Sequence, residues 1–141
     1  MDREILPIIL IFVFLLLVGL VIYLNNTSRI NDTLRQKVWN DVLQIKKMLD
    51  TKNPLIYRDI IVRLDALLGK SLRLYYNNSE SCGTNLKQAR DLFDRDEYNK
   101  IWKAHKLRNI VVHENKEITS LEIEESYDII SLAIKKLLYE K

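Results

Sequence analysis

The feature that most constrains the 141-residue sequence is an uncharged apolar run from Ile5 to Leu24. Its twenty residues are interrupted only by Pro7 and Gly19, and a helix of about 20 apolar residues crosses the roughly 30 Å hydrocarbon core of a bilayer. We therefore predict a transmembrane anchor over residues 1–24. The alternative is a cleaved signal peptide. The run is too long for a typical signal core, however, and the flank Asp2-Arg3-Glu4 is not basic.

The charges on either side of this run predict its orientation. Arg3 is the only basic side chain before it, whereas Arg29, Arg35 and Lys37 follow soon after it. Basic residues flanking a membrane segment are enriched on the cytoplasmic side. We expect a single-pass protein of the cell membrane, with the N-terminus outside and the C-terminal domain in the cytoplasm.

The composition of the rest of the chain predicts an all-α fold. The whole sequence contains only three Gly and two Pro, and about 110 residues after the apolar run suffice for a four- to five-helix bundle. We expect a short polar linker over residues 25–32 and a bundle over residues 33–141. The single Cys82 excludes an intrachain disulfide framework and a multi-cysteine zinc site. The net charge of +3 permits anionic partners without requiring them.

Apolar residues at three- and four-residue spacing predict the helices of this bundle. The first covers residues 33–50, with Asp32 as its N-cap, and the second begins at Pro54 and ends near Tyr76. A polar loop over residues 77–83 contains Cys82, and a short helix over 85–93 follows. The pattern Thr119-Ser120-Leu121-Glu122 is a capping box that opens the last helix. Its expected core stripe is Ile123, Tyr127, Ile130, Ile134 and Leu137.

A central helix over residues 98–114, N-capped by Asp94, carries the residues of greatest functional interest. At about 100° per residue, one narrow stripe of this helix contains Tyr98, Trp102, His105, Asn109 and His113. Asn109 and His113 are an i,i+4 pair, so the amide is placed to orient the imidazole. Arg108 lies about 140° around the helix from His113. The two side chains reach one phosphate if the last turn loosens or if two copies of the helix meet.

Arg108, Asn109 and His113 carry a family resemblance. The text Leu-Arg-Asn-Ile-Val-Val-His-Glu resembles the Arg-x(4–6)-His signature of the HEPN superfamily, in which a polar residue often follows the Arg. The resemblance implies a small helical bundle with a capped amphipathic helix after the motif. Many members are metal-independent ribonucleases whose paired motif helices form one composite site in a dimer. Others have lost catalysis and act as binding or toxin–antitoxin partners.

The motif residues have the chemistry that such cleavage needs. An imidazole populates both protonation states near neutrality, because its unperturbed pKa is ~6.5. A guanidinium binds phosphate through two parallel hydrogen bonds and keeps its charge. We assign catalysis to Arg108, Asn109 and His113. One motif His per chain supplies one proton-transfer group, so a homodimer is required. The resemblance implies products with a 2′,3′-cyclic phosphate and a 5′-hydroxyl.

Other interpretations of the same residues stay open. Tyr98 and Trp102 either stack on RNA bases or belong to the core, and His105 is a packing or dimer-interface residue. The bundle is alternatively a catalytically inactive membrane-tethered interaction module, or a scaffold in which the Arg–His spacing is accidental. We expect no cofactor and no metal. The residues His105, His113, Glu114 and Glu117 lack the spacing that di-iron helical bundles use.

Overall fold

The computed structural model describes the backbone of residues 2–140, and the side chains of residues 7–24 and 32–140. These residues form helices and short connections without a strand, so the all-α prediction is confirmed. The chain divides into two compact units, one up to Leu34 and one from Arg35 onward. The helices are α1 (Asp2–Asp50), α2 (Tyr57–Tyr76), α3 (Cys82–Gln88), α4 (Arg95–His113) and α5 (Ser120–Tyr139), with 3-10 turns at Pro54–Ile56 and Ala89–Leu92.

The first unit contains a helical segment that is long and apolar enough to cross a membrane. Residues Pro7–Leu24 lie within α1 and have a mean hydropathy of 3.1, and none of them is buried. A helix of this length and composition meets the requirement for crossing the hydrocarbon core of a bilayer. Signal sequences also meet this criterion of helix length and hydropathy.

The expected non-helical linker over residues 25–32 is absent, because α1 continues through it to Asp50. The prediction of a new helix capped by Asp32 was therefore wrong. The segment is rich in Asn, Ser and Thr, which cost a helix only up to about 0.7 kcal/mol each relative to Ala. Neither Gly nor Pro occurs between Gly19 and Asp50 to interrupt the helix. The polar composition of this segment therefore does not break the backbone helix.

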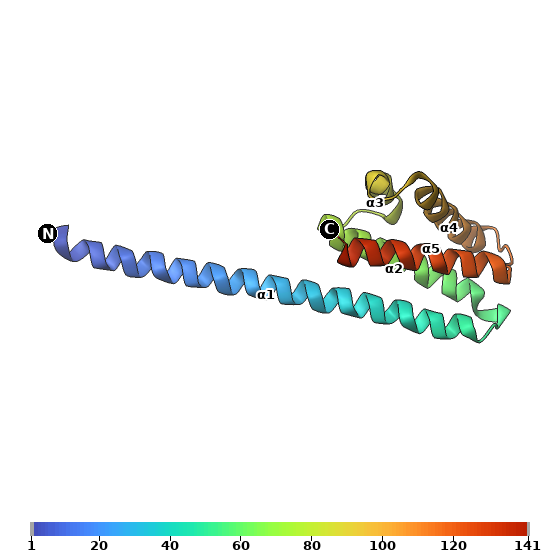
Figure 1. The fold of residues 1–141 in the computed structure, drawn as a ribbon, viewed down its shortest axis with the longest axis horizontal. Coiled ribbons are helices and arrows are strands. Elements are labelled where there is room, and N and C mark those ends of the chain that lie inside the picture. The colour runs from blue at the N-terminus through green and yellow to red at the C-terminus, as the bar shows by residue number, and fades with distance from the viewer. Residues whose placement is uncertain (1, 141) are drawn as a thin grey trace. The chain divides into compact units, whose positions relative to one another are not determined.

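The second unit is a helical bundle with one hydrophobic core. Helix α5 packs along α2, and α4 contacts both (Figure 1). The predicted apolar stripes are confirmed as its main contributors. Buried residues of the last part of α1 are Val38, Val42, Ile45 and Leu49, and those of α5 include Ile123, Tyr127, Ile130, Ile134 and Leu137. The two ends of this unit's sequence meet where the rings of Trp39 and Tyr139 pack edge to face at 6.4 Å.

The predicted capping residues Asp94 and Thr119 begin their helices as expected. The Asp94 carboxylate accepts a hydrogen bond from the backbone N–H of Glu97, and the Glu97 carboxylate accepts one from the backbone N–H of Asp94. Thr119 and Glu122 form the same reciprocal pair at the start of α5. Each box satisfies two backbone donors that a helix start otherwise leaves unpaired.

Replacing Thr119 with alanine is expected to lower the free energy of unfolding by about 1 kcal/mol, because the cap is lost. Hydrogen bonds from Lys116 and Thr119 hold the pKa of Glu122 down to about 2. The contribution of these hydrogen bonds to the free energy of unfolding is therefore present above the ordinary Glu122 pKa of 4.5. It is lost as the pH falls toward 2. Denaturant unfolding of the full chain in detergent measures both effects. The control Thr51→Ala removes an exposed threonine at no helix start and should change stability by less than about 0.5 kcal/mol.

The short third helix begins earlier than predicted. Helix α3 starts at Cys82 rather than Asn85, because the Ser81 hydroxyl accepts a hydrogen bond from the backbone N–H of Thr84 at 3.1 Å. Cys82 is thus a helical residue and not part of a loop. It lies close to α2, where a Cβ on Gly69 would come within 3.2 Å of the Cys82 Cβ. The absence of a side chain at Gly69 permits this close approach of α2 and α3.

Candidate functional site

Arg108 lies in the fourth turn of α4, and its guanidinium is held by two neighbours. Its Nη1 donates to the Asn109 side-chain oxygen at 2.9 Å. Its Nε lies 3.6 Å from Oδ2 of Asp65 on α2, and the Arg108 side chain is 33% exposed. The carboxylate partner of Arg108 is therefore Asp65. The guanidinium is therefore fixed against α2 while part of it remains open to solvent.

His113 is the last residue of α4, and it is exposed. Asn109 was expected to orient this imidazole, but its side-chain oxygen accepts from Arg108. Within residues 32–140, no hydrogen bond joins Asn109 to His113. Within one chain, Arg108 and His113 also have no common partner among these residues. The structure thus leaves His113 free to approach a ligand.

Asp65 is the residue that the sequence interpretation missed. It lies in α2 at the same helical register as the core residues Ile61, Leu68 and Leu72, and its residue surface is only 6% exposed. A carboxylate buried in an apolar stripe needs a charged or hydrogen-bonded partner, because its desolvation is costly. An aspartate within the apolar stripe of α2 could therefore have indicated a buried polar site from the sequence. The partners themselves come from α3 and α4 and could not be identified from the sequence of α2.

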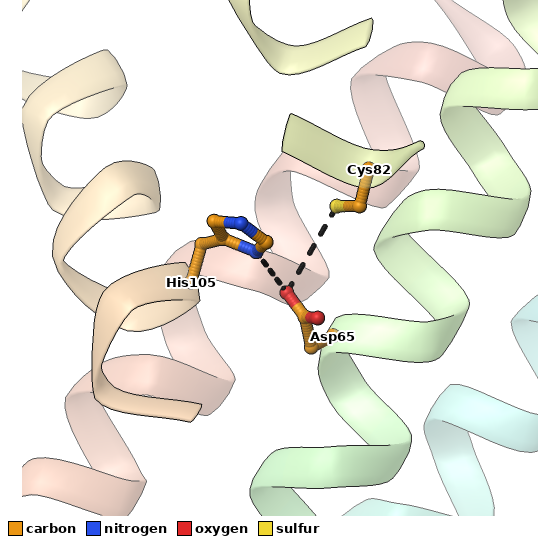
Figure 2. Close-up of side chains that lie close together, drawn as sticks. All are labelled: Asp65, Cys82 and His105. Carbon is orange, nitrogen blue, oxygen red and sulfur yellow. Dashed lines mark hydrogen bonds and ion pairs between the residues drawn. The ribbon is translucent and has the colours of Figure 1, made fainter. Parts of the chain in front are cut away.

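Two side chains from two different helices converge on one carboxylate oxygen of Asp65 (Figure 2). His105 Nδ1 on α4 lies 2.6 Å from Asp65 Oδ1, and Cys82 Sγ on α3 lies 3.9 Å from the same oxygen. The side chains of His105 and Asp65 are 13% and 8% exposed. We call Asp65, Cys82 and His105 the carboxylate cluster. It joins α2, α3 and α4 through short polar contacts at the edge of the core.

Gly83 on α3 lies next to His105. A Cβ built on Gly83 would lie 3.5 Å from His105 Nε2 and 4.0 Å from the Trp102 ring. The first turn of α3 therefore lies against the imidazole edge that does not face Asp65. His105 therefore packs between α2 and α3 within one chain.

Tyr98 and Trp102 continue the ring contacts along α4. Tyr98 and Trp102 are edge to face at 6.3 Å, and Trp102 and His105 at 5.5 Å. Tyr98 and Trp102 are half-buried and pack against the hydrophobic core. Base stacking or dimer contact by these rings stays a prediction, and only their partly exposed edges are available for it.

The Cys82 thiol is a poor nucleophile in this environment. Burial, followed by the charge of Asp65, raises its pKa from 9.0 to about 12, so the reactive thiolate is scarce at neutral pH. We expect iodoacetamide at pH 8 to modify Cys82 at least about tenfold more slowly in the folded chain than in urea. Mass spectrometry of timed samples measures this ratio. Equal rates in the two conditions would contradict the raised pKa of the Cys82 thiol.

A groove of about 870 Å³ runs between α4 and α5. Its lining includes Lys100, Lys103, Lys106 and Lys116 together with Glu122, Glu125 and Asp128. Two of these lysines are already paired with acids of the groove, Lys103 with Glu125 and Lys116 with Glu122. Charges of both signs therefore line the groove, and it is not a continuous basic track for a nucleic acid backbone.

No family model, curated protein or solved structure matches this chain.

Proposed function

We propose that this chain is a membrane-anchored endoribonuclease of the HEPN type that cleaves RNA without a metal, as a homodimer. The observation that carries the proposal is the exposed His113 at the end of α4, five positions after a guanidinium that Asp65 and Asn109 hold in place. An oriented guanidinium and a free imidazole supply charge stabilisation and proton transfer.

In this mechanism, the His113 imidazole of one chain accepts the proton of the RNA 2′-hydroxyl. The 2′-oxygen then attacks phosphorus, and the bond to the 5′-oxygen breaks. The imidazolium of the second chain donates a proton to that leaving oxygen. Arg108 binds the phosphate oxygens while negative charge accumulates on them. The products are a 2′,3′-cyclic phosphate and a 5′-hydroxyl.

The buried contacts of His105 support the need for a second chain. The sequence contains two histidines, and His105 is enclosed beside Asp65 at 2.6 Å. His113 is then the one exposed imidazole of residues 32–140. Two proton transfers at one phosphate require two such groups, and a twofold pairing of the motif helices supplies them.

Arg58 offers a further cation near this end of α4. Its Nη1 donates to the side-chain oxygen of Asn115 at 2.8 Å, and Asn115 is two residues beyond His113. A fixed guanidinium next to the loop after α4 favours an anionic ligand there. Arg58 is therefore a candidate for a phosphate neighbouring the cleaved one.

The membrane part of the proposal depends on the apolar helix Pro7–Leu24. The basic residues that follow this segment favour a cytoplasmic bundle by the positive-inside rule. Tethering confines copies of the chain to two dimensions, which raises their effective concentration and favours a dimer.

The test incubates the full chain in detergent micelles with labelled RNA and EDTA. Cleavage should proceed in EDTA and leave 2′,3′-cyclic phosphate ends, and it should be lost in Arg108→Ala and His113→Ala. Intrinsic Trp fluorescence confirms that each sample is folded. Cleavage that persists in both variants would come from a contaminant and would refute the assignment.

A second candidate function is a catalytically inactive, membrane-tethered interaction module. The ion pair of Arg108 with the buried Asp65 favours it, because this contact gives the arginine a structural role without any RNA. Folded wild-type chain that cleaves no RNA in the same test would select this alternative.

A further inference from the structure

The carboxylate cluster brings together three different metal-ligand groups. The donor atoms of Asp65, Cys82 and His105 all lie within 4.8 Å of one another. They come from α2, α3 and α4, so residue spacing within a single helix does not predict this cluster. We propose that these three side chains bind a divalent transition-metal ion of the zinc type, which joins the three helices as a structural site.

The donor types select the class of ion. A thiolate, an imidazole and a carboxylate together suit Zn²⁺ and its spectroscopic substitute Co²⁺, whereas Mg²⁺ and Ca²⁺ prefer oxygen ligands alone. Bonds of about 2.0–2.3 Å in tetrahedral geometry place ligand atoms about 3.3–3.7 Å apart. The Sγ–Oδ1 separation of 3.9 Å is close to this range. Water completes the fourth position.

The short contact within the cluster becomes compatible with a metal when a proton leaves. His105 Nδ1 and Asp65 Oδ1 are 2.6 Å apart, the distance of a strong hydrogen bond. A metal ion replaces that proton and lengthens the distance between Nδ1 and Oδ1 by about 1 Å. The ion also displaces the thiol proton of Cys82, since only the thiolate binds. Cys82 and Gly83 are half-exposed, which gives the ion a route of entry.

Arg108 is placed to act as an outer partner of the metal ligand. Its Nε is buried without a hydrogen-bond partner among the described side chains and lies 3.6 Å from Asp65 Oδ2. When Oδ1 binds the ion, a small rotation of the carboxylate brings Oδ2 into hydrogen-bonding range of Nε. Outer partners of this kind orient ligating carboxylates. The guanidinium therefore contacts the oxygen that the metal does not use.

The experiment titrates the reduced full chain in detergent micelles with Co²⁺ under anaerobic conditions. A thiolate-to-cobalt charge-transfer band should saturate at one ion per chain, together with the visible bands of tetrahedral Co²⁺. Added Zn²⁺ should abolish these bands and raise the thermal midpoint. Because Cys82 is the one cysteine in the sequence, the charge-transfer band reports its thiolate directly.

Matched variants locate the site. Cys82→Ser should remove the charge-transfer band, and His105→Gln should weaken Co²⁺ binding at least about tenfold. His113→Gln changes the other histidine and should leave spectrum and affinity unchanged. Cys82→Ser exchanges a thiol for a hydroxyl at a half-exposed position, and fluorescence confirms that it is folded.

Three outcomes would overturn the proposal: no saturable spectrum with the wild-type chain, the same spectrum with Cys82→Ser, or its loss with His113→Gln. The first would leave the cluster as a hydrogen-bonded junction. The measurement detects the bound ion and not RNA cleavage. A failure of the metal-site proposal is therefore distinguishable from a failure of the ribonuclease proposal.

Discussion

Replacing His113 with alanine is expected to slow RNA cleavage by about 10²–10⁴-fold, the contribution of a positioned proton-transfer group. The side chain is exposed at the end of α4, so the same change should alter the free energy of unfolding by less than about 0.5 kcal/mol. Initial cleavage rates in EDTA and denaturant unfolding of the same samples measure the two quantities. A large kinetic loss without a stability loss is the signature of a catalytic side chain.

Two further variants serve as controls for this measurement. Lys135→Ala removes an exposed cation from α5 and should leave the cleavage rate unchanged. Arg108→Lys keeps the charge but loses the planar fork, so it should retain only part of the rate. If His113→Ala cleaves RNA at the wild-type rate, the imidazole has no role in the reaction, and the ribonuclease proposal is wrong.

Replacing Asp65 with alanine is expected to lower the free energy of unfolding by about 2–3 kcal/mol. The change leaves the buried His105 imidazole and the Arg108 Nε without their carboxylate, and unpaired buried polar groups are costly. The loss lies below the ~3–5 kcal/mol typical of a broken buried pair, because the Arg108 side chain is partly exposed. Denaturant unfolding of the full chain, followed by Trp fluorescence, measures the change.

Asp59→Ala is the matched control for this measurement. Asp59 is also an aspartate of α2 with a basic partner, Arg63, at 2.7 Å, but both side chains are about half exposed. Surface pairs of this type contribute about 0.3–0.5 kcal/mol. A loss at Asp65 no larger than that at Asp59 would show that the carboxylate cluster does not stabilise the fold.

Most of the bundle could be predicted because its signals are local. Capping boxes at Asp94 and Thr119 depend on side chains three residues apart, and the apolar stripe of α5 repeats within one helix. The failures arose where a local signal was ambiguous. Polar residues at 25–32 indicated a linker but lie in a continuous helix, and Ser81 was not identified as the N-cap of α3.

The candidate site was only partly predictable because its decisive contacts are long-range. Arg108, Asn109 and His113 were selected from one helix. The partner of Arg108, however, is Asp65, which is more than forty residues away in the sequence. Cys82 had no visible base nearby in the sequence, yet it lies 3.9 Å from the same carboxylate. Sequence spacing within a helix carries no information about which side chains of other helices meet it.

One consequence follows from the single carboxylate that serves an imidazole, a thiol and a guanidinium. The energetic effects of changing these groups cannot be additive, because each loss alters what the remaining partners gain from Asp65. A double-mutant cycle between Asp65 and His105 should therefore show a large interaction energy. Over evolutionary time, an exchange at any of these four positions would be tolerated best when it is accompanied by another, so that they drift as a set.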